Sequence, residues 1–366
     1  MGLFFMVLNA HFIAAAEQVV VLPNGLTVLV EEDHRFPLVA IRLYVHAGSA
    51  YETDEQAGIS HLLEHMVFKG TKKRKPGQIA REVESVGGYI NAATSFDYTV
   101  YSVDMPDRYW KLGLDIVQDM VFGSIFDPEE LAQEKNVVLA ELERGEDNPG
   151  QKLFKLIQSR VWAGLPYERP IIGFKQTVNK FTGQDLKNYI HKLYQPRNML
   201  LVVCGNVDRK EVMSEANKLF GELENTGILD VVQKCDLRNG ETEMGRNGDG
   251  EKWRNRVVLE RGPWKKVYLN MALPIPGLRS ADGPALEVLA YALGGDMSSV
   301  LYRKFKYELQ LVDDISCSAF MLERAGMFYF NVMLDPDKVE QFWEKFIQEI
   351  AGFTPFNLPQ EIIDRA

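Results

Sequence analysis

The sequence predicts an α+β protein with two homologous domains, each an antiparallel sheet covered by helices. Strand-like runs rich in Val, Leu and Ile alternate with helical segments along the first half of the chain. The strand, loop and helix order of residues 38–70 returns at residues 266–295, which indicates an internal repeat. The 366 residues, of which 46% are hydrophobic, are enough for two packed cores. The formal net charge of −10 argues against nucleic acid as a partner, because phosphate binding needs a basic face.

The first sixteen residues have the character of an export signal. Residues 1–16 are mostly apolar and end in small residues, so cleavage after Ala16 would leave Glu17 as the mature start. This predicts a periplasmic or secreted protein. The stretch lacks the basic segment that usually begins such a signal. The alternatives are an N-terminal helix or a slightly mis-set start codon, with a cytoplasmic location. No later stretch approaches the roughly 20 apolar residues needed to span a bilayer.

The strands expected in the first half are short apolar runs bounded by turn residues. Residues 18–33 carry two such runs around Pro23-Asn24-Gly25, a typical hairpin signal. Residues 89–105 alternate with a period of two and are expected to form a single strand. The full set of expected strand segments is 18–33, 38–48, 89–105 and 198–207.

The expected helices have recognisable start and stop signals. Asp127 is the predicted N-cap of one of them, with Pro128 as its first residue. Glu129 and Glu130 then occupy the first turn, where the helix dipole favours negative charge. The full set of expected helices is 55–68, 78–86, 109–121 and 128–144.

A polar, glycine-containing segment separates the two expected domains. Residues 225–256 contain few apolar runs and are interpreted as a linker or surface insertion. The first domain is therefore expected over residues 17–224 and the second over residues 257–366. The three cysteines, Cys204, Cys235 and Cys317, are far apart and do not indicate a disulfide framework. Cys204 and Cys317 are expected to be buried strand thiols.

The repeat shows that the first copy carries polar groups that helix packing does not require. When Gly283 is set against Gly58, three apolar residues of the second copy align with three ionisable residues of the first: Leu286, Leu289 and Ala290 against His61, Glu64 and His65. A helix in this position can therefore be packed with ordinary apolar side chains. The ionisable groups of the first copy must serve another purpose.

These ionisable groups have the spacing of a catalytic zinc site. His61 and His65 lie one helical turn apart on one face, which suits two nitrogen ligands at about 2.0–2.1 Å from a zinc ion. A catalytic zinc needs three protein ligands and a water whose pKa falls to about 7. The Glu64 carboxylate beside that water could take its proton as the water attacks a carbonyl, and then pass the proton to the leaving amine.

The third ligand is expected from the helix predicted at residues 128–144. Glu134, Val137, Val138 and Glu141 follow each other at helical spacing, so two carboxylates share an apolar stripe. Burying an unpaired carboxylate costs several kcal/mol, and a metal or a histidine partner removes that cost. The spacing leaves open which of the two acids binds the metal.

The remaining histidines are poorer candidates for metal ligands than His61 and His65. His11 lies in the expected signal, and three more histidines have no second ligand at helical spacing: His34, His46 and His191. The site could instead be a hydrogen-bonded polar cluster in the core. A purely structural zinc site is the other alternative, but Glu64 would then be an unfavourable ionisable residue without a role.

The motifs around this site resemble those of a known peptidase family. "HLLEH", residues 61–65, matches the inverted zinc motif of the inverzincins. "AGISHLLEHMVFKGT", "GGYINAATSFDYTVYS" and "EKNVVLAELE" are similar to segments of the M16 (pitrilysin-type) metallopeptidases, which include the mitochondrial processing peptidases and bacterial proteins like them. The resemblance covers the chain from about residue 18 and implies the M16/LuxS-like metallohydrolase architecture.

The resemblance also implies a role for each residue of the site. It places zinc on His61, His65 and Glu141, with Glu64 as general base. Glu134 corresponds to a second acidic residue, which orients a zinc-bound histidine. The strand around Asn91 and Ala92 is expected to offer its edge to an extended peptide, although its alternation fits an ordinary core strand equally well.

Two departures from the family pattern affect the expected activity. Active relatives supply an Arg and a Tyr soon after "GGxMSS", where this chain has Leu309 and Asp313; Tyr302, Arg303 and Tyr307 are nearby but out of register. The second domain also breaks off in "LPQEIIDRA", residues 358–366, which suggests an incomplete domain. The chain is therefore expected to be a zinc-bearing endopeptidase half that works with a second M16 half or subunit. The alternative is a non-catalytic binding or scaffold subunit of an M16-type complex.

Overall fold

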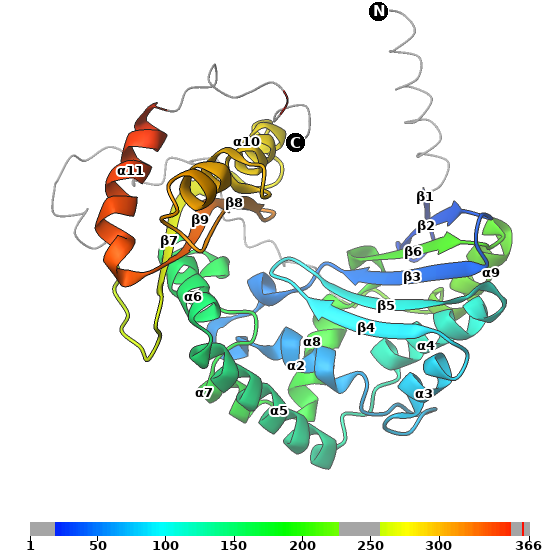
Figure 1. Cartoon of the computed structure of the whole chain (residues 1–366). Coiled ribbons are helices and arrows are strands. Elements are labelled where there is room, and N and C mark those ends of the chain that lie inside the picture. The colour runs from blue at the N-terminus through cyan, green and yellow to red at the C-terminus, as the bar shows by residue number, and fades with distance from the viewer. Residues whose placement is uncertain (1–18, 227–256, 353–360, 362–366) are drawn as a thin grey trace, which may run out of the picture. The chain divides into compact units, whose positions relative to one another are not determined.

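The computed structural model describes residues 19–226, 257–352 and 361 (Figure 1). The expected signal at residues 1–16, nearly all of the expected linker at residues 225–256, and Cys235 lie outside the described residues. The chain divides into two compact units. The first contains residues 1–142 and 169–233, and the second contains residues 143–168 and 234–366.

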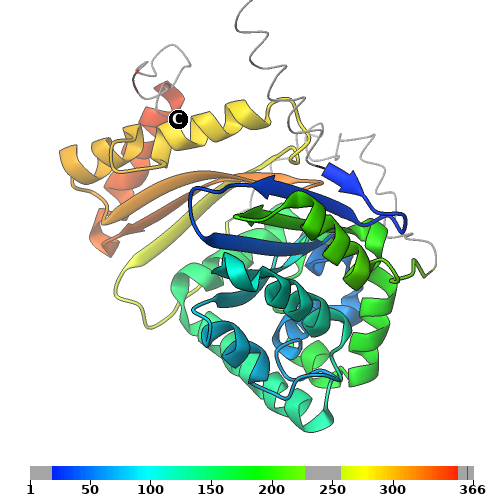
Figure 2. The same ribbon diagram turned by 90° about the vertical axis from the view of Figure 1, so that its right-hand side faces the viewer.

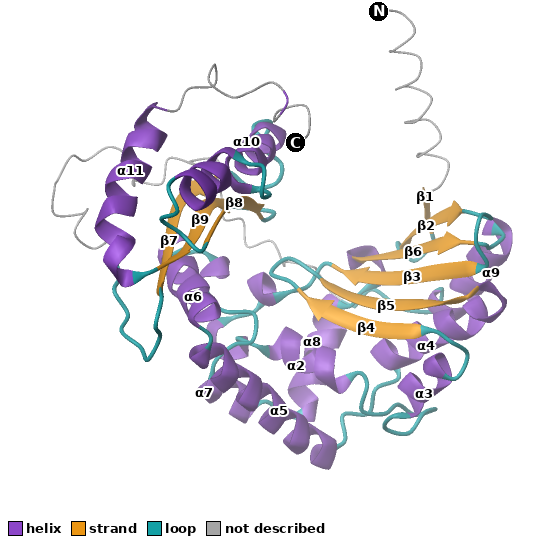
Figure 3. Ribbon diagram, viewed as in Figure 1, coloured by secondary structure: helices purple, strands orange, loops and turns teal. Residues whose placement is uncertain are grey.

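The first unit is built on a six-stranded sheet with the order β1-β2-β6-β3-β5-β4 (Figure 3). The hairpin predicted at residues 18–33 is confirmed by the antiparallel pairing of β1 with β2. The remaining neighbours are also antiparallel, except that β2 and β6 run parallel. The strands are β1 Val19–Val21, β2 Thr27–Glu32, β3 Leu38–Val45, β4 Tyr89–Thr94, β5 Thr99–Pro106 and β6 Met199–Gly205.

The single strand expected at residues 89–105 is wrong, because the segment folds as the hairpin of β4 and β5. The strands pair from Tyr89 opposite Asp104 to Thr94 opposite Thr99, and residues 95–98 form the turn between them. The Ser95 amide closes this turn on the Tyr98 carbonyl at 2.7 Å. The buried position of β4 is even-numbered, Ala92, whereas those of β5 are odd-numbered, such as Tyr101 and Val103, so the turn shifts the alternation by one residue. Residues 95–98 contain neither glycine nor proline, which are the strongest turn signals, and the two strands are therefore predicted as one.

Helices of the first unit pack on one face of this sheet (Figure 1). The inward residues of the strands, such as Ile41 and Leu43, are fully buried, as are Leu62 and Leu63 of the helix that carries the histidines. The core therefore lies between the sheet and the helices, as Figure 2 shows from the side. The helices are α2 Ile59–Met66, α3 Gln78–Glu84, α4 Trp110–Phe122, α5 Pro128–Asp147, α7 Lys175–Lys180, α8 Gly183–Leu193 and α9 Arg209–Phe220.

Helix α2 begins later than expected because two glycines cross at its start. Gly58 has φ +96°, and a Cβ there would lie 2.6 Å from the Ile172 carbonyl oxygen. Gly173, with φ +75°, leaves only 2.3 Å between a Cβ and the Ala57 carbonyl oxygen. Only glycine combines this left-handed backbone with such a close approach. The crossing fixes where α2 enters the core.

The second unit contains a three-stranded antiparallel sheet with the order β7-β9-β8. This order repeats the β3-β5-β4 part of the first sheet, and α10 lies between β7 and β8 in the chain as α2 lies between β3 and β4. The predicted internal repeat is thus visible in the topology, and the α+β class is confirmed. The elements are α6 Pro149–Val161, β7 Val267–Ile275, α10 Gly283–Gly294, a π-helix at Tyr302–Glu308, β8 Asp314–Met321, β9 Gly326–Leu334 and α11 Val339–Gly352.

Helix α6 belongs to the second unit, although residues 17–224 were expected to form one domain. Phe154 of this helix lies against Phe320 and Tyr329, with ring centroids 6.2 Å apart in each case. Trp162 follows the helix and is 1% exposed, with its indole N–H 3.4 Å from the Gly326 carbonyl oxygen. The apolar face of α6 therefore completes the second core. The sequence around α6 could not predict this packing, because the contacting residues lie far along the chain.

The two cysteines of the described residues differ in burial. Cys317 is 3% exposed, as expected for a strand thiol, and burial raises its pKa above the ordinary thiol range. Cys204 is only partly buried, so the expectation for this residue is wrong. Its strand neighbours Leu201 and Val203 point into the core, and the alternation of the strand turns Cys204 to the other face.

A buried charge network anchors the loop that follows α2. The Arg74 guanidinium is 2.7 Å from carboxylate oxygens of both Asp119 and Asp115 and 2.9 Å from one of Glu82. The Thr71 hydroxyl donates to Asp119 at 2.7 Å. The side chains of Arg74 and Asp119 are 8% and 2% exposed. Such a network is costly to break, because either partner alone would be a buried unpaired charge.

We expect Arg74→Met to destabilise the protein by about 3–5 kcal/mol, because Asp119 would lose its partner in a buried site. Burial raises the pKa of Asp115, but hydrogen bonds from Arg74 and Lys73 outweigh this effect, so its pKa is lowered. The stability that Asp115 contributes is therefore present above about pH 4 and lost as the pH falls further. Urea unfolding at pH 7 and pH 3 measures both effects. The exposed neighbour Lys75, changed to Met, serves as the control; an equal loss in both variants would contradict the network.

Candidate metal centre

Helices α2 and α5 bring two imidazoles and a carboxylate to one point. One ligand atom from each of His61, His65 and Glu141 lies within 4.8 Å of the other two. The Nε2 atoms of His61 and His65 are each 3.8 Å from the same oxygen, Oε2 of Glu141. The two imidazole centroids are 4.7 Å apart. The histidines of α2 and Glu141 of α5 are at least 76 positions apart in the sequence, yet their ligand atoms lie close together.

The donor set fits a divalent metal ion such as zinc. Two ligands of a tetrahedral zinc lie about 3.4 Å apart, so the observed separations need only small adjustments. Burial, and then the nearby His65, lower the pKa of His61 to about 4, which leaves this imidazole neutral and able to donate a lone pair. Among the described residues, Nδ1 of His61 is a buried atom without a hydrogen-bond partner. Protein hydrogen bonds therefore do not account for the burial of this imidazole.

Glu134 lies on the opposite side of the His65 imidazole from Glu141. Its Oε2 is 3.1 Å from His65 Nδ1, and its Oε1 is 2.5 Å from Lys69 Nζ. An acceptor at Nδ1 holds the proton of the neutral imidazole there and leaves the Nε2 lone pair free. The sequence left open which acid would bind a metal. The geometry puts Glu141 beside both Nε2 atoms and Glu134 behind His65.

Glu64 lies on α2 between His61 and His65 and is not part of the metal-ligand group. The Thr94 hydroxyl, at the end of β4, donates a hydrogen bond of 2.6 Å to Oε2 of Glu64. Glu64 is partly buried. Thr94 was not among the residues predicted for the site. Its position in "NAAT", beside the expected edge strand, was the available signal.

The buried stripe of α5 includes fewer residues than the sequence predicted. Val138 is fully buried and Glu134 is 6% exposed, but Val137 is 43% exposed. The expectation that Val137 shares the buried stripe is therefore wrong. It lies three residues after Glu134, at the edge of the stripe, where a partner helix no longer covers it.

Strand β4 lies at the end of the sheet order, with β5 as its neighbour. Asn91 is exposed, whereas Ala92 is 7% exposed and packs in the core. Ala92 can therefore offer a ligand only its backbone groups. Asn91 can offer its side chain as well.

Several groups fix the start of α2. The amides of Gly58 and Ser60 each donate a 2.8 Å hydrogen bond to the carboxylate of Glu52, which is 5% exposed. The Ser60 hydroxyl is 2.7 Å from the buried Tyr189 hydroxyl. These bonds satisfy donors that a helix N-terminus would leave unpaired. The helix that carries His61, Glu64 and His65 is thus held at its start as well as along its apolar face.

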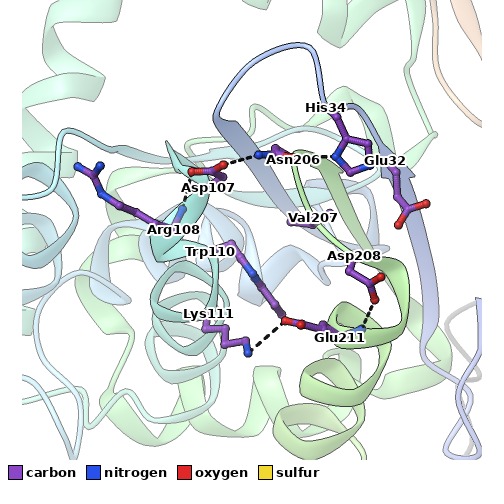
Figure 4. A pocket seen from close by; sticks show the side chains of 10 residues that line it. All are labelled: Glu32, His34, Asp107, Arg108, Trp110, Lys111, Asn206, Val207, Asp208 and Glu211. Atoms are coloured by element: carbon purple, nitrogen blue, oxygen red, sulfur yellow. Dashed lines mark hydrogen bonds and ion pairs between the residues drawn. The ribbon is translucent and has the colours of Figure 1, made fainter.

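A separate surface hollow of about 510 Å³ lies near the start of α9 (Figure 4). Its polar groups are engaged with one another: Asn206 donates to Asp107 and lies 2.6 Å from His34 Nδ1, and Lys111 pairs with Glu211 at 3.3 Å (Figure 4). None of the ligand residues of the metal centre lines this hollow. It is therefore distinct from the metal centre.

In the second unit, the two positions expected to lack the family's Arg and Tyr have other partners. Asp313 pairs with Lys266 at 2.8 Å, and Leu309 packs against the second core. Tyr302 accepts a 2.7 Å hydrogen bond from Lys306, and its ring lies 5.5 Å from that of Tyr307. Neither Leu309 nor Asp313 offers a free polar group of the expected kind.

Comparison with protein families matches nearly the whole described chain. A family model described as insulinase (peptidase family M16) matches residues 27–175. A second model, described as peptidase M16 inactive domain, matches residues 180–366. The first match contains every residue of the metal centre. Within the described ranges, the helices are too short or too polar to span a lipid bilayer.

Individual relatives agree with these matches. The chain is 32% identical over 345 residues to an uncharacterized zinc protease of Rickettsia felis, covering 93% of this chain and 79% of the relative. It is 33% identical over 214 residues to a probable mitochondrial-processing peptidase subunit beta of Arabidopsis thaliana, covering 58% of this chain and 40% of that protein.

Solved structures show the same fold. A protease from Helicobacter pylori matches with a TM-score of 0.81 at 22% identity, over 95% of this chain and 82% of that one. The first half of the periplasmic protease PqqL from Escherichia coli matches with a TM-score of 0.64 at 21% identity, over 88% of this chain and 69% of that one.

We expect Glu141→Gln to weaken zinc retention more than Glu134→Gln does. The first change replaces the anionic group that faces both Nε2 atoms, while the second removes only the partner of His65 Nδ1. Loss of such an outer partner typically costs about 10–100-fold in metal affinity, and loss of a ligand costs more. Zinc content after dialysis against a weak chelator measures the order. The reverse order would exchange the two roles.

Proposed function

This chain belongs to peptidase family M16, and on that premise we propose that it is a zinc-dependent endopeptidase acting on extended or unfolded peptides. The observation that carries the proposal is the convergence of His61, His65 and Glu141, with Glu64 on the same helix as the two histidines but outside the ligand group. A scaffold would have no use for Glu64 in this position.

The proposed chemistry is a general acid–base hydrolysis of the peptide bond. When bound by His61, His65 and Glu141, a zinc ion supplies Lewis-acid chemistry that acidifies water and polarises the scissile carbonyl. Glu64 takes a proton from the attacking water and delivers it to the leaving amide nitrogen. Thr94 occupies one oxygen of Glu64, which leaves the other oxygen for the water.

The proposed substrate site is the outer edge of β4. An extended peptide can add to a strand edge through main-chain hydrogen bonds, which is the β-augmentation mode. Asn91 and Ala92 lie on this strand, and Thr94 at its end contacts Glu64. A peptide on this edge would therefore run toward the metal centre. Recognition through the main chain favours unfolded chains without a sharp sequence rule.

We propose that a second M16 half or subunit completes the active site. The support is the absence of the family's Arg and Tyr at residues 309 and 313, where this chain has Leu and Asp. One relative is named as a subunit, and one matching structure is the first half of a larger protease. The proposed location is the periplasm or the exterior, which rests on the apolar residues 1–16.

A non-catalytic scaffold subunit is the second candidate function. Leu309 and Asp313 favour it, as does the match of residues 180–366 to an inactive-domain model. The His61, His65 and Glu141 group argues against it, because binding without hydrolysis needs no such convergence. Zinc bound without any turnover, even beside a supplied second half, would favour the scaffold.

Replacing Glu64 with Gln should abolish turnover and leave zinc binding intact. Loss of a general base typically costs about 10²–10⁴-fold in rate, while the metal-ligand group is unchanged. Hydrolysis of an internally quenched unfolded peptide, together with zinc content, gives both readouts. Glu84→Gln, an exposed acid on α3, is the matched control. Equal turnover in Glu64→Gln and wild type would remove Glu64 as the base.

Thr94→Val should lower kcat by about tenfold with little change in KM. The variant keeps the shape of the side chain but removes the hydroxyl that orients Glu64, an interaction that matters in the chemical step rather than in peptide binding. Thr94→Ser retains the hydroxyl and should restore most of the rate. Steady-state kinetics on the same peptide measures both. A rise in KM without a change in kcat would assign Thr94 to substrate binding instead.

A further inference from the structure

We propose that Lys69 is a positioning residue of the metal centre, which holds Glu134 so that this carboxylate fixes the orientation of His65. The proposal deepens the proposed function and rests on the zinc site described there. It assigns a purpose to a lysine that neither the motif nor the metal-ligand group contains. Lys69 would not touch the metal or the substrate.

The chain returns Lys69 to the site directly after α2. The Lys69 amide donates to the Met66 carbonyl at 3.1 Å, so this residue lies in the turn that ends the helix. Gly70 follows with φ +106°, and a Cβ there would lie 3.2 Å from Pro76 Cδ. The chain reverses at this point. The Lys69 side chain is 32% exposed and its Nζ reaches Oε1 of Glu134 at 2.5 Å.

The two oxygens of Glu134 have different partners. Oε1 accepts from Lys69, and Oε2 faces Nδ1 of His65 at 3.1 Å. The Glu134 side chain is only 8% exposed, so few waters can compensate its charge. The His65 imidazole makes one contact with this carboxylate, at Oε2. Lys69 supplies the compensating charge and holds the carboxylate at a second point.

This two-point attachment determines how firmly His65 is held. With Lys69 removed, Glu134 could rotate about its last bonds or turn toward water, and the Nδ1 contact would loosen. Outer partners of metal-binding histidines typically contribute about 10–100-fold to metal affinity. Because Lys69 acts one contact further out, we expect an effect at the lower end of this range.

The direction of the effect separates positioning from simple charge. Removing a cation near a cation-binding site would tighten zinc binding by electrostatics alone, since like charges repel. Loss of positioning would weaken zinc binding instead. A part-exposed ion pair with only a structural role would change unfolding of the metal-free protein and leave zinc affinity unchanged.

The test is the zinc dissociation constant of the full chain, measured by competition with a chromogenic chelator. Lys69→Met should bind zinc about tenfold more weakly than wild type, and Lys69→Arg should return to within about twofold. Lys72→Met, an exposed lysine of the same loop, is the matched control and should behave as wild type. Equal or tighter zinc binding by Lys69→Met would overturn the proposal.

A double-mutant cycle tests the route through Glu134. If Lys69 acts by holding Glu134, the double variant Lys69→Met/Glu134→Gln should bind zinc no more weakly than Glu134→Gln alone. Additive losses would show that Lys69 acts by another route. Cobalt(II) bound in place of zinc provides a spectroscopic check, because its visible absorption reports ligand geometry, and Lys69→Met should alter it. An unaltered spectrum would contradict the positioning role.

The outcomes also distinguish this proposal from the proposed function. If wild type binds zinc tightly and Lys69→Met does so equally well, only the role of Lys69 fails. If wild type binds no zinc, the proposed function fails and Lys69 loses its role with it. Lys69→Arg keeps the experiment informative if Lys69→Met folds poorly, because it retains the charge and the reach of the side chain.

Discussion

The metal centre depends on a carboxylate that the protein buries between two helices. Glu134 joins α5 to His65 of α2 and to Lys69 in the turn after α2. Glu141 lies seven residues further along α5, which is about two helical turns or roughly 10.5 Å. The imidazole of His65 therefore lies between two acids of one helix face. The buried contact between Glu134 and His65 fixes the position of α5 along α2, and therefore also the position of Glu141.

The sequence was sufficient for the parts of this protein that obey local periodicity. The spacing of His61, Glu64 and His65 predicted a helix, which the structure confirms, and suggested the chemistry proposed for it. Glu134 and Glu141 stood out as acids among apolar neighbours. Features that depend on partners far along the chain were not accessible. Lys69 carries no local signal and Thr94 only its place in the strand, because each matters through a contact with a residue on another element.

The errors in the predicted fold also arise where local sequence signals are missing or where the partner residues are distant. The turn between β4 and β5 contains neither glycine nor proline, so the usual turn signals are missing. Helix α6 packs against residues more than 100 positions later, as the Phe154–Phe320 contact shows. Helix α10 shows the contrasting case. Leu286, Leu289 and Ala290 pack in the second core at the positions where α2 has its ionisable groups. That helix needs no compensating charges, whereas α2 is accompanied by Glu134, Lys69 and Thr94.

Strand β4 has a further consequence for behaviour in solution. It ends the sheet order, and its six residues, Tyr-Ile-Asn-Ala-Ala-Thr, include no charged residue and no proline. Lysines, prolines and bulges are the usual means by which proteins prevent open strand edges from pairing with other copies. A strand edge that could pair with an extended peptide could also pair with the same edge of another copy. Concentrated samples should carry a tendency to self-association, and a bound peptide should relieve it.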